Sequence, residues 1–234
     1  MELKGKIAVV TGVSKGIGEH LCRQLLDKGC TVFGLGRNNS DISNSSYHFI
    51  ETDVRHYDAV KSAFDQILTQ TQNQIHILIN NAGLGYFGNV EDLPLEEWDT
   101  MMQTNVNGMF YCTRLAVPVM KKQSLGHIIN IASTAGLEGM PMVSGYCATK
   151  WAVKGFSESI WRELREDKIK VTCVYPGSVK TDFFRNSPNI QAHDYMLMPE
   201  DVAAMMVYAL QTPDNFHQVN LEVRPLQPKG PKKQ

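Results

Sequence analysis

The sequence predicts an α/β fold in which helices cover both faces of a doubly wound parallel sheet. Short apolar runs alternate with longer segments of helical periodicity along the whole chain, as in strands joined by crossover helices. Several of these runs are apolar at successive positions, which is typical of strands buried on both faces. The first run ends in a glycine-rich segment that leads directly into a helical pattern, as at the first turn of a nucleotide-binding sheet.

Seven apolar runs are the expected strands, and five segments with helical periodicity lie between them. The strands are expected over residues 7–10, 31–35, 47–50, 75–80, 127–132, 171–174 and 219–223. The helices are expected over residues 17–28, 56–70, 95–121, 144–166 and 199–211. The last helix has a clear start, because Pro199 is followed by two acidic residues and both features favour a helix N-terminus.

The length and composition fit one globular domain. We expect that domain over residues 1–226, with a loose basic tail over 227–234. Acidic and basic side chains nearly balance, 24 against 23, so the charge indicates neither nucleic acid nor an anionic membrane surface as a partner. No apolar run has the length of a membrane span. The five cysteines include no Cys-x-x-Cys pair, which argues against a metal site and favours a reducing, cytoplasmic location.

The segment after the first expected strand predicts a nucleotide site. Glycine lets the backbone approach a pyrophosphate, and a helix N-terminus supplies amide donors and the positive end of the helix dipole. A tight turn from strand to helix also needs glycine without any ligand, but the position ahead of a second strand favours nucleotide binding. The candidate residues are Gly12, Ser14, Lys15, Gly16, Ile17 and Gly18.

The end of the second expected strand predicts the choice of cofactor. A carboxylate there would bind the 2′-hydroxyl of a ribose, but the sequence has Gly36 followed by Arg37 and Asn38. A guanidinium binds phosphate with two hydrogen bonds, and Lys15 can approach the same phosphate from the glycine segment. Each cation alone is typical of a solvated surface, but together they predict NADP(H).

The ends of the third and fourth strands carry further candidate contacts. Asp53 and Val54 follow the third strand, where the carboxylate can meet an adenine amine or serve as a turn or helix-cap residue. The fourth strand is followed by small residues, which let a cofactor pass close to the edge of the sheet. These residues are Asn81, Ala82 and Gly83.

The catalytic candidates lie between residues 133 and 150. Tyr146 and Lys150 are four positions apart, on one face of an expected helix. A neighbouring ammonium favours the phenolate, so we expect Lys150 to lower the pKa of Tyr146 from its usual value of about 10. Ser133, at the end of a strand, can hold a carbonyl oxygen near the phenol. Tyr-x-x-x-Lys also occurs by chance on helices, but with Ser133 it predicts proton transfer to or from a carbonyl or an alcohol.

The motifs occur together in one order and with one set of spacings. They are Thr11 to Gly18, Asp53-Val54, Asn80 to Gly83, Asn105, Ser133, Tyr146, Lys150 and Pro176 to Thr181. In this pattern the chain resembles the short-chain dehydrogenase/reductase family over about residues 4–225. The resemblance implies a Rossmann-like, doubly wound parallel sheet of about seven strands with helices on both faces.

The resemblance also implies roles for individual residues. Ser133, Tyr146 and Lys150 would be catalytic, and Asn105 would hold a water molecule in a proton relay. Tyr146 and Lys150 would also contact the cofactor, with Lys150 on the nicotinamide ribose. The segment that packs on the nicotinamide would contribute Pro176, Gly177, Val179 and Thr181. A homotetramer or a homodimer built on helices 95–121 and 144–166 is implied as well, and the aromatic residues of the second helix would contribute to it or to the core: Trp151, Phe156 and Trp161.

The ending of the chain narrows the implied substrate. Residues 219–225 resemble the ending of NADP-dependent 3-hydroxy acid and serine dehydrogenase-like proteins, and they lack the Asp-Gly-Gly tail common in 3-ketoacyl carrier-protein reductases. The implied reaction is the interconversion of a small or medium carbonyl compound and its alcohol. A 3-ketoacyl thioester is the alternative substrate class. A non-catalytic nucleotide sensor or scaffold on the same fold is the alternative function, although the complete catalytic set argues against it.

The residues expected around the substrate are mostly apolar. They are Leu84, Tyr86, Phe87, Leu137, Met140, Pro141, Met142 and Phe183. An expected lid over residues 182–198 contains Arg185 and His193, which are the candidates for binding a substrate carboxylate. A lone histidine in a lid is more often a surface residue, so the expected site is apolar and adaptable.

Overall fold

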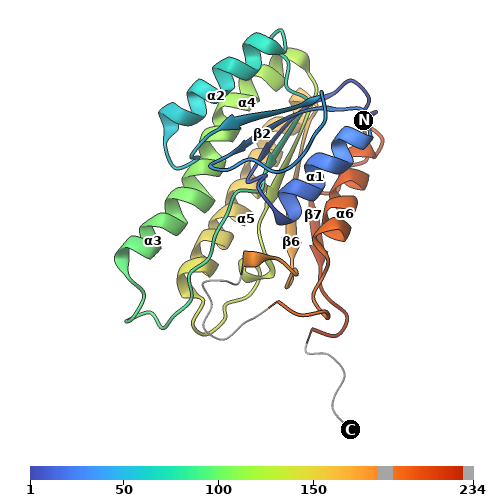
Figure 1. Ribbon diagram of the computed structural model, residues 1–234. Helices are drawn as coiled ribbons and strands as arrows, with labels where there is room; N and C mark the ends of the chain where they lie inside the picture. The colour runs from blue at the N-terminus through green and yellow to red at the C-terminus, as the bar shows by residue number, and fades with distance from the viewer. Residues whose placement is uncertain (184–191, 229–234) are drawn as a thin grey trace.

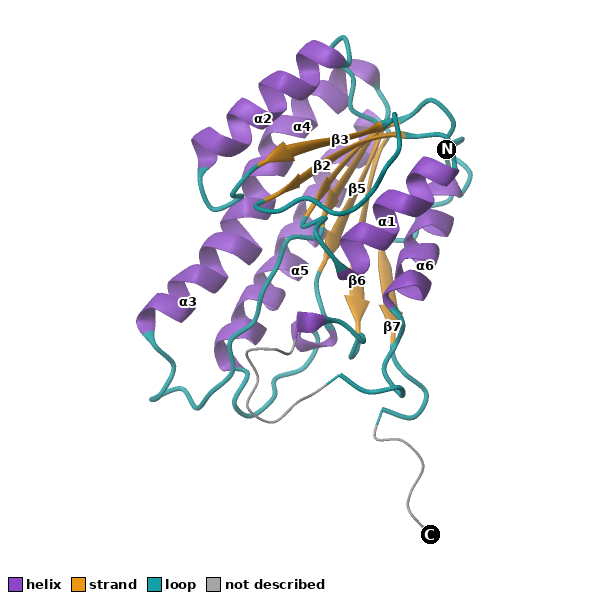
Figure 2. Cartoon of the chain, viewed as in Figure 1, coloured by secondary structure: helices purple, strands orange, loops and turns teal. Residues whose placement is uncertain are grey.

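The computed structural model describes residues 1–183 and 192–228, and within them seven strands form one sheet (Figures 1 and 2). The strand order is β3-β2-β1-β4-β5-β6-β7, and every pairing is parallel. The strands are β1 Ile7–Thr11, β2 Thr31–Gly36, β3 Tyr47–Glu51, β4 Ile77–Asn80, β5 Gly126–Ile131, β6 Ile169–Pro176 and β7 Asn220–Val223. This arrangement confirms the predicted fold class.

Helices cover both faces of the sheet (Figure 2). One face packs against α1 Gly16–Asp27 and α6 Pro199–Gln211. The other face packs against α2 Tyr57–Gln70, α4 Met109–Gln123 and α5 Ser144–Leu164. The remaining helical segments are α3 Leu95–Met102, η1 Gln103–Gly108, η2 Thr134–Gly136 and η3 Arg165–Asp167.

The two faces explain why the strands read as continuous apolar runs. Ala8 and Val10 of β1 belong to the core under α1 and α6, whereas Val9 belongs to the core under α2, α4 and α5. All three side chains are fully buried. Successive side chains of a strand point to opposite faces, so a strand with helices on both sides needs apolar residues at every position.

The order in which successive strands are added to the sheet reverses between β3 and β4. The chain moves outward from β1 to β3, returns to place β4 beside β1, and then moves outward on the other side. The carboxyl ends of β1 and β4 therefore form the switch point at which open α/β sheets bind their ligands. There the Thr11 hydroxyl accepts hydrogen bonds from the backbone N–H groups of Asn81, at 3.0 Å, and Ala82, at 2.9 Å.

The expected helix over residues 95–121 is wrong in one respect. A π-helical turn, Gln103–Gly108, separates α3 from α4. The side chain of Asn105 in this turn bonds the backbone of Leu84, and a Cβ added at Gly108 would lie only 2.8 Å from Val54. Such tertiary contacts hold one extra residue in a helical turn, and π-turns of this kind are frequent at functional sites.

Smaller differences concern the ends of elements. β4 begins at Ile77 rather than at residue 75, and the backbone N–H of Ile75 donates to the side chain of Gln123 instead of a strand. None of the described helices has the length and apolarity needed to cross a membrane. The domain bounds, 1–226, and the tail over 227–234 stay predictions, and residues 229–234 lie outside the described part of the chain.

Candidate active site

The four catalytic candidates converge beyond the carboxyl ends of β4 and β5. Ser133 precedes η2, directly after β5, whereas Tyr146 and Lys150 lie on successive turns of α5. Asn105 lies in the π-turn between α3 and α4. Gly83 is in contact with two of them, since a Cβ added there would lie 3.3 Å from Asn105 Oδ1 and 3.6 Å from Lys150 Nζ. The structure therefore brings together residues that are up to 45 positions apart in the sequence.

Tyr146 is a buried phenol, only 8% exposed. Its burial raises the pKa of the phenol well above the usual value, and the hydrogen bond with the Ser133 hydroxyl acts in the opposite direction. The expected net lowering of the Tyr146 pKa is therefore wrong for this structure. The physical reason is that the cost of removing a phenolate from water is larger than the stabilisation that the nearby groups give to it.

Lys150 is a buried ammonium, 5% exposed. Its Nζ donates a hydrogen bond of 2.8 Å to the carbonyl oxygen of Ile131, at the end of β5. The same nitrogen lies 5.6 Å from the centre of the Tyr146 ring. Burial lowers the pKa of Lys150 to about 8. At pH 7 the side chain is thus still a cation, and the carbonyl of Ile131 holds it against the phenol.

Asn105 connects the segment after β4 to α5. Its Oδ1 accepts from the backbone N–H of Leu84 at 2.9 Å, and its Nδ2 donates to the Leu84 carbonyl at 2.8 Å and to Thr149 Oγ1 at 3.0 Å. The Thr149 hydroxyl in turn donates to the carbonyl oxygen of Tyr146 at 2.8 Å. This chain of bonds fixes the first turn of α5, which carries the phenol, relative to the edge of the sheet.

The glycine segment fits the pyrophosphate of a dinucleotide. Gly12 and Gly16 have positive φ angles of 72° and 64°, which favour glycine. A Cβ added at Gly18 would lie 2.2 Å from the carbonyl oxygen of Gly12 and 2.5 Å from Asn81 Nδ2, so only glycine fits there. No side chain of the described residues caps the start of α1. The first N–H groups of α1 are therefore left for an anion at the positive end of the helix dipole.

The remaining candidates of the glycine segment have different surroundings. Ser14 is half-buried in the loop, and Ile17 packs against the core under α1. Lys15 forms an ion pair with Asp182, with 2.6 Å between Nζ and Oδ2. Asp182 belongs to the segment after β6, so this pair joins the two sides of the expected cofactor site.

The candidate cofactor contacts after β2 are exposed, whereas those after β3 already have contacts within the protein. Arg37 and Asn38 are exposed at the end of β2. Asp53 instead accepts hydrogen bonds from the guanidinium and the backbone N–H of Arg55, and the Arg55 hydrogen bonds hold the pKa of this carboxyl below its usual value. Asp53 thus has a structural role as a turn residue in this structure. Val54 is buried against Gly108, where it supports the π-turn.

The segment after β6 closes the other side of the expected cofactor site. Pro176 ends β6, and the backbone N–H of Gly177 donates to the Val223 carbonyl at 2.7 Å. Val179 is buried in the core under α1 and α6. A Cβ added at Gly16 would lie 3.2 Å from Thr181 Cγ2, so this segment contacts the glycine segment directly.

Two residues of the site were given no role by the sequence reasoning. Thr11 holds the segment after β4 against β1, and Thr149 links Asn105 to the first turn of α5. Thr149 lies three positions after Tyr146, so its helical position was the signal that could have identified it. Thr11 had a signal too, because it is the last residue of β1 and immediately precedes the first glycine.

Only some of the apolar residues expected around the substrate pack around Tyr146. Residues from three segments pack around Tyr146 in one cluster: Leu84, Tyr86, Phe87, Val143 and Phe183. Leu137 packs instead with Met109, Ala132 and Val153. Met140 and Met142 are each 39% exposed. His193 lies beside Tyr195, with 6.1 Å between the ring centres, and Arg185 lies outside the described residues.

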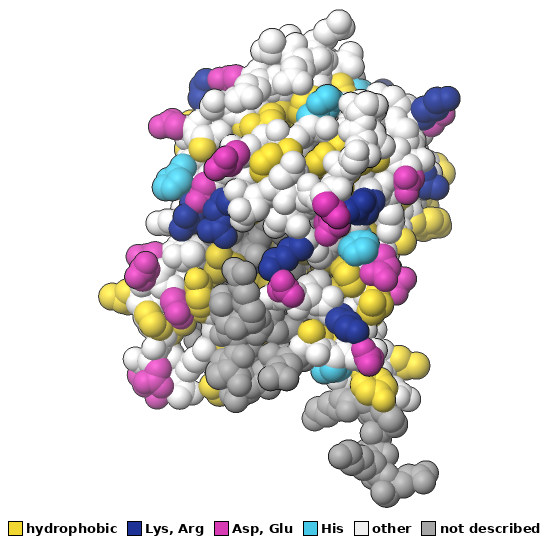
Figure 3. Space-filling view, viewed as in Figure 1, with side chains coloured by type: hydrophobic (Ala, Val, Ile, Leu, Met, Phe, Trp, Pro, Cys, Tyr) yellow, Lys and Arg dark blue, Asp and Glu magenta, His cyan; other side chains and the backbone are white. Residues whose placement is uncertain are grey.

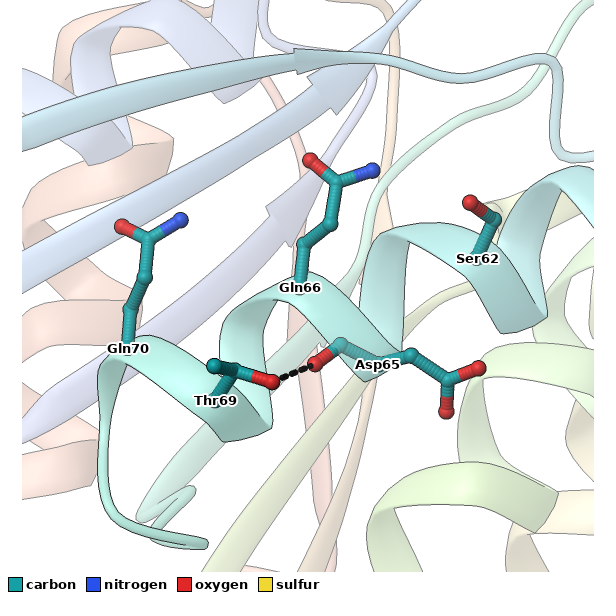
Figure 4. Close-up of a pocket in the computed structure, with 5 residues that line it drawn as sticks. All are labelled: Ser62, Asp65, Gln66, Thr69 and Gln70. Atoms are coloured by element: carbon teal, nitrogen blue, oxygen red, sulfur yellow. Dashed lines mark hydrogen bonds between the residues drawn. The ribbon is translucent and has the colours of Figure 1, made fainter.

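The depression along α2 does not have the chemistry of a rival site. Side chains of both charges are spread over the face in Figure 3, in keeping with the balanced composition. The depression in Figure 4 lies along α2 and is lined by Ser62, Asp65, Gln66, Thr69 and Gln70. There Asp65 pairs with Lys61, and Thr69 donates to the backbone of its own helix. No group of metal-ligating side chains occurs among the described residues.

Comparisons with known proteins agree with this geometry. The family model described as short chain dehydrogenase matches residues 6–191. An uncharacterized oxidoreductase of Staphylococcus aureus (strain MW2) is 35% identical over 231 residues, which cover 96% of this chain and 99% of that protein. An uncharacterized oxidoreductase of Staphylococcus epidermidis (strain ATCC 12228 / FDA PCI 1200) is 32% identical over 238 residues, with the same coverage of each chain.

Solved structures agree as well. The closed form of serine dehydrogenase complexed with NADP⁺ is 31% identical, with a TM-score of 0.86 and coverage of 94% of this chain and 95% of that chain. Serine dehydrogenase from Escherichia coli is also 31% identical, with a TM-score of 0.84 and coverage of 94% and 98%. Because the family model covers most of the sequence and these relatives span nearly all of it, the chain belongs to the short-chain dehydrogenase family.

Proposed function

We propose that the protein is an NADP(H)-dependent oxidoreductase that interconverts a carbonyl compound and its alcohol, with Tyr146 as the general acid and base. The observation that carries this proposal is the buried contact between the Tyr146 phenol and the Lys150 ammonium, with Ser133 bonded to the phenol. These groups lie beside Gly83, at the edge of the sheet where the glycine segment offers an anion site.

Tyr146 and Ser133 carry the proton chemistry in this proposal. A bound nicotinamide supplies or accepts the hydride. Tyr146 gives its proton to the carbonyl oxygen in reduction and takes it back from the alcohol in oxidation, while the Ser133 hydroxyl donates a hydrogen bond to the same oxygen. The raised pKa keeps Tyr146 protonated at neutral pH, which is the state that reduction needs.

Lys150 and Asn105 support that proton transfer. The Lys150 cation favours the phenolate that Tyr146 becomes once its proton has left, and its remaining N–H groups can bind ribose hydroxyls. Asn105 holds the backbone of Leu84 and the first turn of α5 in place. In the proposed relay it would also position a water molecule.

NADP(H) is the proposed cofactor for two reasons. Arg37 is exposed at the end of β2, where the 2′-phosphate of the adenine ribose would lie, and Gly36 puts no carboxylate beside it. Solved relatives that are 25–31% identical contain NADP, including the closed serine dehydrogenase and the ElxO structure. The proposed cofactor contacts are the glycine segment, Arg37, Asn81 to Gly83, and the segment from Pro176 to Thr181.

The test of this function is turnover of a panel of carbonyl compounds and alcohols, followed by the absorbance of the reduced cofactor. The expected result is reduction of at least one uncharged ketone or aldehyde with NADPH. Tight NADPH binding without turnover of any panel member, in either direction, would instead support the non-catalytic nucleotide sensor. The serine substrate of the solved relatives and a 3-ketoacyl thioester belong in the same panel.

A further inference from the structure

We propose that Phe87 and Phe183 determine substrate specificity and restrict the site to uncharged carbonyl compounds with an apolar aryl or alkyl substituent. This inference rests on the proposed function, since it concerns what is placed next to the Tyr146 hydroxyl. It separates the protein from an enzyme that acts on an amino acid or another carboxylate, such as the serine dehydrogenases to which it is similar in fold.

The argument begins with three aromatic rings in mutual contact. The Tyr146 ring lies 5.3 Å from Phe183 and 6.0 Å from Phe87, and the two phenylalanines are 6.2 Å apart, measured between ring centres. The rings are tilted or edge-on, at 55° to 76°, rather than stacked flat. Such arrangements are favourable between aromatic rings, and they place two apolar walls beside the phenol.

The backbone fixes the position of both phenylalanine rings. A Cβ added at Gly85 would lie 2.9 Å from Phe183 Cζ and 3.0 Å from Phe87 Cζ, so the tips of both rings converge on this glycine. The next residue, Tyr86, donates its backbone N–H to Met101 Sδ at 3.4 Å. A substituent on the carbonyl carbon of a substrate bound to Tyr146 therefore meets ring carbons.

The rim beyond the rings is apolar as well. The backbone N–H of Gly88 donates to the carbonyl of Met142 at 2.9 Å, which joins the segment after β4 to the segment before α5. Met142 thus lies against the segment that carries Phe87, and it is 39% exposed. Thioether side chains pack against many apolar shapes, so the rim suits alkyl and aryl groups of different size.

Two cations of the surrounding described segments, Arg224 and Lys15, are already paired. Arg224 bonds Glu138 at 2.9 Å and also Glu222, and Lys15 bonds Asp182. An acid bound beside Phe87 would lose its water without gaining a partner among these groups, and burying an unpaired carboxylate is costly.

The test compares ethyl acetoacetate with acetoacetate, which offer the same ketone with and without a negative charge. We expect kcat/KM with NADPH to be at least ~100-fold higher for the ester, a ratio worth about 2.7 kcal/mol. Equal use of both compounds, or preference for the acid, would overturn the inference and leave the proposed function intact. Failure of every ketone and aldehyde would count against the proposed function itself.

Variants then show whether the two rings are responsible. Phe87→Ala and Phe183→Ala should raise KM for acetophenone at least ~tenfold, because each removes one apolar wall, with NADPH affinity unchanged. Phe183→Leu should restore most of the loss. Phe87→Arg should reduce the ratio of ester to acid at least ~tenfold, an effect that loss of packing alone would not produce. Phe110→Ala, at an exposed aromatic residue of α4, is the control and should change none of these values. An unchanged KM in Phe87→Ala and Phe183→Ala, together with an unchanged charge preference in Phe87→Arg, would overturn the assignment.

Discussion

The Lys150 ammonium lies 5.6 Å from the centre of the Tyr146 ring and donates its hydrogen bond to the carbonyl of Ile131. A cation and a phenol are thus buried together at the point where α5 meets the end of β5. Burial disfavours the charged form of each, so the pKa of Lys150 falls to about 8 while that of Tyr146 rises. The resting pair is an ammonium beside a neutral phenol, the state suited to donating a proton to a carbonyl.

The first prediction concerns that proton. Tyr146→Phe should lower kcat/KM for carbonyl reduction by about 10²–10⁴-fold, because general acid groups contribute that much. The fold and the affinity for NADPH should be nearly unchanged, since only a hydroxyl is lost. Steady-state kinetics and fluorescence titration with NADPH measure both quantities. Tyr208→Phe, on the exposed side of α6, is the matched control, and activity within tenfold of the parent in Tyr146→Phe would refute the assignment.

The second prediction is that the buried Lys150 lowers the free energy of unfolding of the protein. Below pH 8 Lys150 is charged in both the folded and the unfolded protein, so the cost of burying the cation is present at pH 7. As the pH rises from about 8 to 10.5 the folded protein loses this proton first, and stability rises by about 3 kcal/mol. Lys150→Met should therefore raise the free energy of unfolding at pH 7 by about 1–3 kcal/mol, while activity falls sharply.

Urea unfolding at pH 7 without cofactor measures this effect. Lys154→Met is the matched control, because Lys154 lies one turn further along α5 and is only half-buried. It should change stability by less than about 0.5 kcal/mol. A Lys150→Met protein that is less stable than the parent would show that the hydrogen bond to Ile131 outweighs the cost of burying the charge.

The sheet and the position of the site could be predicted from the sequence, because they depend on local patterns. Apolar runs identify buried strands, and the glycine segment identifies the end of β1. The π-turn at Asn105 could not be predicted, since the extra residue is held by contacts with segments that are distant in the sequence. The pKa of Tyr146 could not be predicted either, because spacing shows the neighbouring cation but not the depth of burial.

The third prediction concerns the close approach of the glycine segment to Asn81. Gly18→Ala should lower the free energy of unfolding by about 1–3 kcal/mol, because the added Cβ would lie 2.2 Å from the carbonyl oxygen of Gly12. It should also weaken NADPH binding at least ~tenfold, since the turn before α1 must move. Gly155→Ala on α5 has open space around the new Cβ and should raise stability by about 0.5–1 kcal/mol instead. Similar effects of both substitutions on unfolding and NADPH titration would contradict this account.

The fourth prediction is an acid-sensitive position at the far end of β5. His127 is 1% exposed, and its Nε2 lies 2.8 Å from Thr172 Oγ1. The Thr172 hydroxyl already donates to Gln218, so Nε2 is the donor and Nδ1 is left without a partner in the described structure. Burial lowers the pKa of His127 well below its usual value, and His217, Lys170 and the N-terminal ammonium add to the effect.

A depressed pKa makes the unfolded chain the better proton acceptor in mild acid. The stability that neutral His127 contributes is present above pH ~6.5 and is lost as the pH falls from there toward the lower pKa of the folded protein, by up to about 1.4 kcal/mol per pH unit. His127→Leu should therefore reduce the loss of stability between pH 7.5 and pH 5.5, measured by urea unfolding. The same substitution at exposed His56 should leave that loss unchanged. A parent and a His127→Leu protein with equal pH dependence would mean that another group governs the acid response.

The last prediction concerns the choice between NADPH and NADH. A charge-assisted hydrogen bond is worth about 1.5–3 kcal/mol, so the exposed guanidinium of Arg37 should favour NADPH in kcat/KM by at least ~tenfold. A Cβ added at Gly36 would meet nothing closer than 3.4 Å, so a side chain fits there. Gly36→Asp with Arg37→Ala should lower the NADPH to NADH ratio at least ~100-fold, because it removes the attraction and adds repulsion.

Lys15 should contribute less to that choice than Arg37. Its ammonium already lies 2.6 Å from Asp182, so it must give up one ion pair to form another, whereas Arg37 is exposed at the end of β2. Lys15→Ala should therefore lower the ratio less than Arg37→Ala, and Lys61→Ala on α2 is the control for a general loss of positive charge. Steady-state kinetics with both cofactors decides the point. Equal or better use of NADH by the parent would mean that neither cation binds the phosphate, whereas a larger effect of Lys15 would mean that the pair with Asp182 opens when NADPH binds.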